Sequence, residues 1–296
     1  MSVQAEWIAV DWGTSRLRAW AMADGAVIAQ AHSDQGMCCL QPDAFEGALL
    51  ALIEGWLTGG TTDVVACGMV GARQGWMEAP YVAAPCPALP EQLVQVPCKD
   101  VRLRVFLVPG LKQVQPADVM RGEETQMAGF LSQNKSWDGV ICLPGTHTKW
   151  AHVSADEVVS FRSFMTGEMF KLLTQQSVLR HSVGAGWNAE AFQAGLDMTL
   201  SRPESLASEL FSIRAGDLLL GTSPDVATAR LSGLLLGAEL AASRPYWLGQ
   251  QIAVIGESSL AGVYAEALKT QGAWVEVVDA DAMTRAGLQA ARAQVS

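Results

Sequence analysis

The chain has 296 residues, of which half are hydrophobic and 17% are charged, and its formal net charge is −10. This length accommodates two domains of ordinary size, and the composition is that of a well-packed globular enzyme and not of a disordered chain. The acidic balance and the lack of a Lys/Arg run exclude nucleic acid as a partner. Residues 1–6 show no signal peptide, and the most apolar predicted helix, 234–242, contains Glu239 and is too short for a bilayer. A cytoplasmic protein without a membrane partner is therefore expected.

The first predicted hairpin, residues 7–20, has the features of a phosphate site. An apolar run delivers Asp11 to a strand end, where a carboxylate suits Mg²⁺ because this small cation prefers oxygen ligands and keeps much of its water shell. Glycine lets the backbone approach an anion, and the hydroxyl and N–H groups of the turn can donate to it. Arg18 adds positive charge in the second strand. The phosphate-binding candidates of the turn are Gly13, Thr14, Ser15 and Arg16. An ordinary hairpin with a polar turn is the alternative interpretation.

A partial echo of this hairpin occurs near the middle of the chain. Strands are predicted over 139–142 and 150–153, and the turn between them aligns Gly145-Thr146 with Gly13-Thr14. Leu143 stands where the first hairpin has Asp11. Further phosphate-binding candidates of this turn are His147 and Lys149. The repeat predicts two related lobes that grip a nucleotide from both sides, an N-terminal lobe over 1–136 and a C-terminal lobe over 137–296.

After the first hairpin, the pattern predicts a strand over 27–33, an amphipathic helix over 43–57, a buried strand over 62–67 and a strand over 102–108. The glycine-rich and proline-rich stretch 68–97 is too long and irregular for a simple connection. Within it, Arg73 can hold a carboxylate through two hydrogen bonds, and Trp76 can supply an apolar wall of a substrate site. A surface arginine over a structural tryptophan is the alternative.

The stretch 118–131 places two acidic residues, Glu123 and Glu124, at the start of a predicted helix. Carboxylates are favoured there by the helix dipole, so capping accounts for them without any chemistry. The functional alternative is that one of them faces a cleft as a general base. Six cysteines, with no C-x-x-C spacing and no companion histidines, predict free thiols and no zinc site.

The second half of the chain repeats the plan of strands and helices. The predicted strands are 139–153 (flanking the turn), 157–164, 251–255 and 274–278, and the predicted helices are 169–179, 188–200, 204–213, 225–242, 261–270 and 280–293. Glu168, before the first of these helices, is interpreted as a capping carboxylate in preference to a cleft residue. Gly233 and Gly237 allow close approach of a helix or of a nucleotide. Gly256 and Ser258 follow a strand at a helix start, where an anion or adenine can bind.

The paired hairpins resemble those of the actin, hexokinase and Hsp70 superfamily. This resemblance implies an α/β, actin-like ATPase (ribonuclease H-like) fold, in which each of two lobes has a mixed sheet flanked by helices and a cleft lies between the lobes. The second hairpin of the superfamily often carries its own Asp, which Leu143 replaces here. Hexokinase-like members have an Asp-Thr pair at a comparable helix start as the base, which favours Glu124 over Glu123. A late glycine turn contacts adenosine in the superfamily, and Gly256 matches it.

Within the superfamily, the chain resembles the 2-dehydro-3-deoxygalactonokinases. The motifs that carry this resemblance are Asp11-Trp12-Gly13-Thr14, Gly68-Met69-Val70-Gly71, Arg121-Gly122-Glu123-Glu124-Thr125-Gln126, Pro144-Gly145-Thr146-His147 and Met165-Thr166-Gly167-Glu168. The resemblance implies phosphorylation of the 6-hydroxyl of 2-dehydro-3-deoxy-D-galactonate in galactonate catabolism, with ATP and Mg²⁺. Arg73 or Arg121 then holds the carboxylate of this sugar acid.

Two alternatives stay open at this point. One is a kinase of the same fold that acts on another sugar acid or on a neutral sugar. The other is a non-enzymatic ATP-driven clamp or regulator, which is disfavoured because the chain shows no added partner-binding domain. The expected partners are small molecules, namely ATP and a sugar acid, and a homodimer is the assembly considered.

Overall fold

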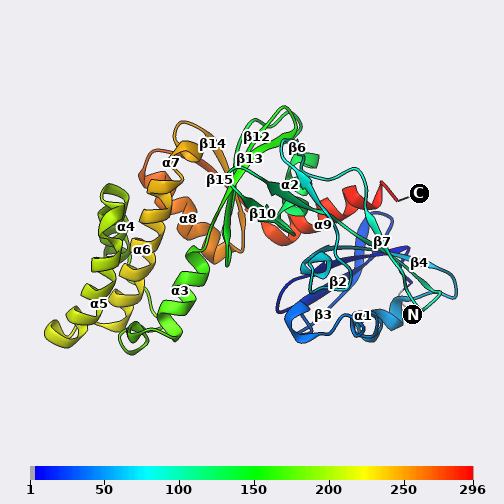
Figure 1. The fold of residues 1–296 in the computed structure, drawn as a ribbon, viewed down its shortest axis with the longest axis horizontal. Coiled ribbons are helices and arrows are strands. Elements are labelled where there is room, and N and C mark those ends of the chain that lie inside the picture. The colour runs from blue at the N-terminus through cyan, green and yellow to red at the C-terminus, as the bar shows by residue number, and fades with distance from the viewer. Residues whose placement is uncertain (1–3, 296) are drawn as a thin grey trace. The chain divides into compact units, whose positions relative to one another are not determined.

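A computed structural model of the chain describes residues 4–295 and divides it into two compact units (Figure 1). Unit 1 contains the described residues up to 138, together with 153–160 and those from 279 on, and unit 2 contains 139–152 and 161–278. The expected division between 136 and 137 lies close to the first of these boundaries. It differs for 153–160 and for the last helix, which belong to unit 1. Residues 1–3, part of the stretch tested for a signal peptide, lie outside the described residues.

Unit 1 is built on a six-stranded sheet with the order β3-β2-β1-β4-β8-β7. Its strands are β1 (Trp7–Trp12), β2 (Leu17–Ala23), β3 (Ala26–Ser33), β4 (Thr62–Gly68), β7 (Val94–Val96) and β8 (Leu103–Leu107). Strand β1 pairs antiparallel with β2 and parallel with β4, and β4 pairs parallel with β8. Every residue of β4 is buried, as expected for a central strand that is covered on both faces.

Successive side chains of β1 point to opposite faces of this sheet, and helices pack on both faces. The helices of unit 1 are α1 (Phe45–Ile53), α2 (Glu123–Gln133) and α9 (Ala280–Arg292). Ile8 and Val10 of β1 share a core with Phe45 and Leu49 of α1. Trp7 and Ala9 of β1 share a second core with Leu288 and Ala291 of α9. The last helix of the chain therefore completes the unit that its first strand begins.

Helices α2 and α9 approach closely through glycine. A Cβ atom on Gly129 would lie 2.0 Å from the carbonyl oxygen of Met283, and one on Gly287 would lie 1.9 Å from the carbonyl oxygen of Thr125. Side chains at these two positions would force the helices apart. The start of α2, which carries the two adjacent glutamates, is thus positioned by α9.

The stretch 68–97, expected to be irregular, contains short strands. These are β5 (Tyr81–Ala83), β6 (Cys86–Pro87) and β7. Strand β5 forms a three-stranded sheet with two strands that follow this stretch, β9 (Gly110–Gln113) and β10 (Asp118–Met120). Strands of two or three residues broken by prolines carry no alternating pattern, which is why the sequence did not predict them.

Unit 2 contains most of a second six-stranded sheet, with the order β15-β14-β11-β12-β13-β6. Its further strands are β11 (Gly139–Leu143), β12 (Thr148–Ser154), β13 (Glu157–Phe164), β14 (Gln251–Gly256) and β15 (Trp274–Asp279). Strands β11, β12, β13 and β14 occupy the places of β1, β2, β3 and β4, and the pair β11–β14 is parallel like β1–β4. The repeat predicted from the two glycine turns is therefore present in the topology, and the expected α/β fold with helix-flanked mixed sheets is confirmed.

The remaining helices belong to unit 2. They are α3 (Thr166–Gln175), α4 (Ala189–Ser201), α5 (Leu206–Leu220), α6 (Pro224–Ala242), α7 (Arg244–Trp247) and α8 (Ser258–Thr270). Helices α4 and α6 pack closely through two glycines of α6. A Cβ on Gly233 would lie 2.1 Å from the carbonyl oxygen of Phe192, and one on Gly237 would lie 2.3 Å from that of Leu196.

Several helices have bounds that differ from the predicted ones. The helix expected over 43–57 is α1 followed by a 3₁₀ turn, Glu54–Trp56, and the one expected over 204–213 continues to Leu220. Helices α3 and α8 begin three residues earlier than expected, at Thr166 and Ser258. In each of these two cases the first turn contains hydroxyl or glycine residues, which are typical of both loops and helix starts.

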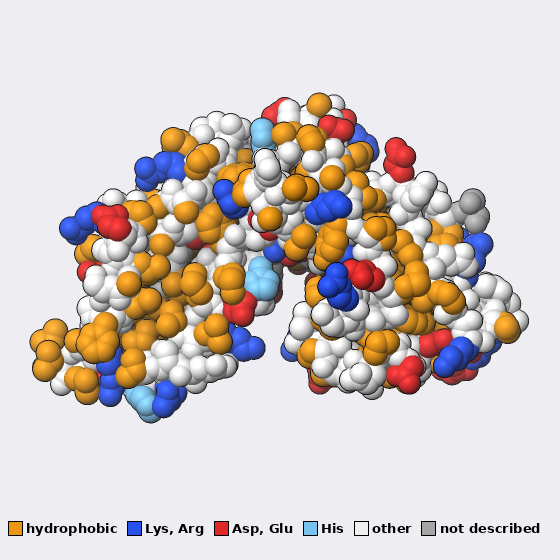
Figure 2. Space-filling model, in the orientation of Figure 1, with side chains coloured by type: hydrophobic (Ala, Val, Ile, Leu, Met, Phe, Trp, Pro, Cys, Tyr) orange, Lys and Arg blue, Asp and Glu red, His pale blue; other side chains and the backbone are white. Residues whose placement is uncertain are grey.

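Among the described residues, no helix combines the length and the hydrophobicity needed to cross a bilayer. Figure 2 shows hydrophobic side chains gathered over the region of the α4, α5 and α6 helices. The exposed large apolar residues of α5 are Phe211, Leu218, Leu219 and Leu220.

Candidate active site

Two glycines with positive φ bring the start of α2 to the end of β4 in unit 1. Gly68 has φ +90°, and a Cβ there would lie 2.7 Å from the carbonyl oxygen of Trp12 and 3.3 Å from Oδ1 of Asp11. Gly122 has φ +106°, and its Cβ would lie 3.4 Å from the Cα of Gly68. Both positions need glycine because L side chains rarely adopt this conformation. The end of β1 with Asp11 and the helix start with Glu124 are thereby held beside each other.

Glu124 is fully buried at this helix start. Its Oε2 accepts a hydrogen bond from the N–H of Gly122 at 2.6 Å, and its Oε1 accepts one from the hydroxyl of Thr125 at 3.0 Å. Burial raises the pKa of Glu124 to about 8, with a further contribution from the neighbouring Glu123, although the hydrogen bonds oppose this shift. A carboxyl group with such a pKa can take up a proton near neutral pH, as a general base must.

Glu123 lies in a different environment from its neighbour. It is half-buried, and its Oε2 accepts a hydrogen bond from the N–H of Arg121 at 3.0 Å, which is a local contact at the helix start. The two glutamates thus differ in burial and in hydrogen-bond partners, and Glu124 is the one that accepts from the N–H of Gly122, the N-cap residue of α2.

Asp11 forms an ion pair with Arg18 on the neighbouring strand β2, and Arg18 also pairs with Asp281 of α9. The Asp11 side chain keeps 19% of its surface exposed. The thiol of Cys67, at the end of β4, lies 3.9 Å from Oδ1 of Asp11. Burial and the carboxylates of Asp11 and Glu124 raise the pKa of this thiol well above its usual range, so it stays neutral. Arg18 balances the negative charge at this strand end.

The residues around Asp11 fit a Mg²⁺ ion that arrives with a nucleotide. Within residues 4–295, no group of three or more His, Cys, Asp or Glu side chains is arranged to hold a metal ion by itself. A Mg²⁺ ion bound to nucleotide phosphates does not need such a group, because it takes one or two carboxylates and keeps several waters. The partly exposed carboxylate of Asp11 is suited to this role.

Backbone hydrogen bonds to the segment at residues 37 and 38 fix the first predicted phosphate turn. The N–H of Gly13 donates to the carbonyl of Arg16 at 2.8 Å, which closes the turn. The carbonyl groups of Gly13 and Thr14 accept hydrogen bonds from the N–H groups of Met37 and Cys38, both at 3.0 Å. Because its carbonyl groups are tied to this segment, the turn is fixed, and the side chains of Thr14, Ser15 and Arg16 are exposed.

Arg121 is the buried arginine of unit 1, with 8% of its surface exposed. Its guanidinium lies over the ring of Tyr81 at 4.3 Å from the centroid, and its Nη2 donates to the carbonyl of Ala79 at 2.7 Å. Its Nε and Nη1 are buried without a hydrogen-bond partner. A buried guanidinium with two nitrogen atoms left without a hydrogen-bond partner is costly, and anionic acceptors at these nitrogens would relieve the cost.

Arg73 and Trp76 lie in less specific surroundings. The Arg73 side chain is 81% exposed, and its Nε lies 3.6 Å from Oε1 of Glu78. Trp76 stacks on Phe45 with ring centroids 6.4 Å apart and meets Trp12 edge-on at 6.3 Å. These contacts match the alternative weighed for this pair, a surface arginine and a structural tryptophan.

In unit 2, the second predicted phosphate turn packs on the start of α3. A Cβ on Gly167 would lie 2.2 Å from the carbonyl oxygen of Gly145, and the N–H of Glu168 donates to the carbonyl of Thr146 at 2.9 Å. Nε2 of His147 lies 2.5 Å from Oε2 of Glu168. Glu168, interpreted from the sequence as a cap, thus contacts the turn itself. Lys149 lies on β12 with only 4% of its surface exposed.

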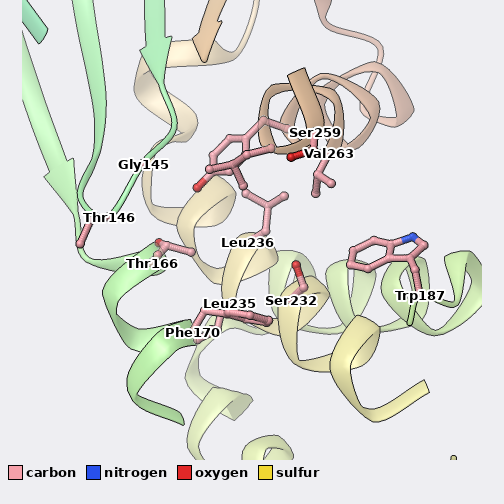
Figure 3. Close-up of a pocket in the computed structure, with 13 residues that line it drawn as sticks. Gly145, Thr146, Thr166, Phe170, Trp187, Ser232, Leu235, Leu236, Ser259 and Val263 are labelled. Atoms are coloured by element: carbon pink, nitrogen blue, oxygen red, sulfur yellow. The ribbon is translucent and has the colours of Figure 1, made fainter. Parts of the chain in front are cut away.

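A cavity of about 460 Å³ opens beside this turn (Figure 3). One part of its wall is polar and consists of the turn residues and hydroxyl side chains, and the other part is apolar and includes aromatic rings. The lining residues are Gly145, Thr146, Thr166, Gly167, Phe170, Trp187, Ser232, Leu235, Leu236, Ser259, Leu260, Val263 and Tyr264. An apolar cavity with a few hydroxyl groups next to a glycine turn is suited to a flat heterocycle joined to phosphate groups.

The three residues predicted to contact adenosine lie around this cavity without lining it. Gly233 packs against α4, which is the helix-packing alternative for that residue, and its neighbour Ser232 lines the cavity. Gly256 ends β14, where its Cβ would lie 3.6 Å from Cδ of Pro144 in the turn segment. Ser258 begins α8, and the next residue, Ser259, lines the cavity.

Sequence reasoning missed most of the apolar wall of this cavity. Phe170, Trp187 and Tyr264 come from different helices and loops, so no local spacing connects them. One further residue near the cavity, Glu239, stands out in the sequence because it is a charged residue within a predicted apolar helix segment.

The repeated sheet, the glycine turn in each repeat and the buried carboxyl group at a helix start agree with the class predicted from the sequence, a sugar kinase of the actin-like fold. Comparisons with known proteins narrow this class. The family model described as "2-keto-3-deoxy-galactonokinase" matches residues 11–291. A Rhizobium meliloti protein named as a probable 2-dehydro-3-deoxygalactonokinase is 38% identical over 98% of both chains. The 2-dehydro-3-deoxygalactonokinase of Escherichia coli is 34% identical over 96% of this chain and 97% of its own.

A solved structure agrees with these matches. The crystal structure of a Sinorhizobium meliloti protein described as a 2-dehydro-3-deoxygalactonokinase superposes with a TM-score of 0.89, at 37% identity, over 98% of this chain and 96% of its own. The chain belongs to the 2-keto-3-deoxy-galactonokinase family, as the resemblance of its motifs predicted.

The raised pKa of Glu124 predicts a pH-dependent stability. Between about pH 4.5 and about 8, the folded protein keeps a proton that the unfolded chain has lost, so the free energy of unfolding falls as the pH rises through this window. Glu124→Gln should remove this contribution and flatten the dependence. Denaturant unfolding of both proteins across the window measures it, and parallel curves for the two proteins would contradict the assignment.

Proposed function

We propose that the protein transfers the γ-phosphoryl group of ATP to the 6-hydroxyl of 2-dehydro-3-deoxy-D-galactonate, with Mg²⁺, in cytoplasmic galactonate degradation. The observation that carries the proposal is the buried carboxyl group of Glu124 beside the strand end with Asp11, in a member of this kinase family. The homodimer considered from the sequence stays a prediction.

Glu124 is proposed as the general base. In the transfer, its ionised carboxylate takes the proton of the 6-hydroxyl, the hydroxyl oxygen forms a bond to the γ-phosphorus, and the bond between this phosphorus and the bridging oxygen breaks to release ADP. Glu124 is covered in the structure, so the proposal requires that the substrate displaces part of this cover. The hydrogen bonds from Gly122 and Thr125 orient the carboxylate and stabilise its charged form.

The nucleotide is proposed to bind both glycine turns through its phosphates and the apolar cavity of unit 2 through its adenosine. Thr14, Ser15 and Arg16 of the first turn are exposed and can donate to phosphate, and Thr146 and His147 can do so in the second. Asp11 would hold Mg²⁺. When bound, Mg²⁺ neutralises charge that develops on the phosphate oxygens.

Arg121 is proposed to bind the carboxylate of the sugar acid. Its two nitrogen atoms without a hydrogen-bond partner, Nε and Nη1, support this role, and its guanidinium lies over the ring of Tyr81. Arg73 is the weaker candidate because its side chain is exposed and lies near Glu78. Both unpaired groups of Arg121 are covered, so the proposal requires that the segment around Tyr81 or Gly71 shifts when the carboxylate enters.

The function is tested by ADP release with MgATP and three acceptors, namely 2-dehydro-3-deoxygalactonate, its gluconate epimer and galactose. We expect strong preference for the galactonate derivative. Preference for another acceptor would favour a kinase of the same fold with a different substrate. Nucleotide binding without turnover of any acceptor would favour the clamp or regulator.

Replacement of the base should affect the chemical step and leave nucleotide binding intact. Glu124→Gln is expected to lower kcat by about 10²- to 10⁴-fold, the usual contribution of a positioned base. Glu123→Gln is the matched control and should change kcat far less, because Glu123 is half-buried and its carboxylate accepts a hydrogen bond from the backbone N–H of Arg121. In the wild type, kcat/KM should rise with pH through about 8 as Glu124 ionises. Equal kcat values for Glu124→Gln and the wild type would remove Glu124 from the role.

The carboxylate site is tested by a pair of arginine variants. Arg121→Met should raise KM for the sugar acid at least about 30-fold, because a truncated buried charge pair costs roughly 2 to 5 kcal/mol. Arg73→Met, the exposed counterpart, should leave KM nearly unchanged. Steady-state kinetics with unfolding controls measure both, and the reverse order of effects would assign the carboxylate to Arg73.

A further inference from the structure

One buried carboxyl group of unit 2 has no place in the proposed chemistry. Glu239 lies near the C-terminal end of α6, among its buried residues, with 3% of its surface exposed. Its Oε1 accepts a hydrogen bond from Nε1 of Trp150 at 2.8 Å, and its Oε2 accepts one from the hydroxyl of Tyr264 at 2.9 Å. The side chain of Thr166 also hydrogen-bonds to it. Three donors from three different elements therefore converge on one carboxyl group.

An ionised carboxylate suits this arrangement because it only accepts hydrogen bonds and has room for all three donors. Burial raises the pKa of Glu239, while the hydrogen bonds oppose the shift. The hydroxyl of Tyr264 additionally lies 2.9 Å from the hydroxyl of Thr148, which extends the network along β12. A buried polar network in which the groups satisfy one another fixes the relative positions of the elements that contribute to it.

Two of the donors border the nucleotide cavity. Thr166 lines it from the start of α3 (Figure 3), and Tyr264 lines it from α8. The two residues after Thr166 contact the second glycine turn, through the close approach of Gly167 to Gly145 and the hydrogen bond from Glu168 to Thr146. The position of Thr166 therefore determines the position of the turn, and that of Tyr264 determines one wall of the cavity.

We propose that Glu239 is the positioning residue of the nucleotide site, which holds the second glycine turn through Thr166 and the cavity wall through Tyr264 in the relative arrangement that a nucleotide needs. The inference rests on the proposed function only in taking the occupant of the cavity to be an adenine nucleotide. Glu239 itself does not line the cavity, so it acts through the two residues that do.

The test is the affinity for MgADP, measured by calorimetry on the full chain. Glu239→Gln keeps the size of the side chain but replaces one acceptor oxygen by an NH₂ group, which leaves one donor unpaired. We expect the dissociation constant for MgADP to rise about 3- to 30-fold, a usual range for residues that act through their neighbours. The KM for the sugar acid should stay within about twofold.

Thr199→Val is the matched control. Thr199 is also fully buried in unit 2, and its hydroxyl donates to the carbonyl of Leu234 at 2.6 Å between α4 and α6; neither of these two residues lines the cavity. Its loss should lower Tm without changing MgADP affinity. Equal loss of affinity in both variants would mean that general destabilisation is responsible, and this outcome would overturn the proposal.

A double-mutant cycle with Thr166→Val tests the route of the effect. If Glu239 acts through Thr166, Glu239→Gln should weaken MgADP binding less in the Thr166→Val background than in the wild type. Strictly additive effects, or unchanged affinity in Glu239→Gln, would overturn the proposal.

If Glu239→Gln does not fold, Thr166→Val and Tyr264→Phe, which each remove one donor, must both weaken MgADP binding. A wild type that does not bind MgADP would instead refute the proposed function.

Discussion

Gly68 and Gly122, both with positive φ, lie against each other where β4 ends and α2 begins. Any side chain at Gly68 would meet the backbone of Trp12 and the carboxylate of Asp11, so only glycine permits the close approach. The contact places Glu124 next to a negatively charged strand end and away from solvent. Burial at this place raises the pKa of Glu124, the adjacent Glu123 adds to the shift, and Arg18 forms an ion pair with Asp11 at the strand end.

The two repeats of the sheet carry different chemistry on the same topology. In the first, the strand end has Asp11, and the surroundings contain charged groups in ion pairs. In the second, Leu143 stands at the matching place, and the surroundings are apolar side chains and hydroxyl groups that form a cavity. The carboxyl group of Glu239 is buried next to residues that line this cavity and has hydrogen-bond partners on three elements. Under the proposed function, the first repeat would serve the transferred group and the second the nucleoside.

Much of the fold followed from local patterns in the sequence. The apolar strands, the two glycine turns and the start of α2 are each encoded within a few neighbouring residues, and their type and order agree with the structure. The missing parts depend on distant residues. Arg18 and Asp281 are 263 positions apart, the cavity wall combines residues of several helices, and β5, β6 and β7 are too short for a periodic signal. The sequence could propose Arg73 and Arg121 equally, because burial, which separates them, is a property of the packed unit.

Helix α9 also constrains how the protein can fold as it is synthesised. Unit 1 needs α9 to cover one face of its sheet and to hold α2, yet α9 leaves the ribosome only after all of unit 2. Most of unit 2, by contrast, is contiguous in sequence and can collapse while translation continues. The earlier-made strands of unit 1 must therefore wait with an uncovered apolar face. A nascent chain in this state is a natural substrate for a chaperone, and its vulnerability ends when residues 280–292 emerge.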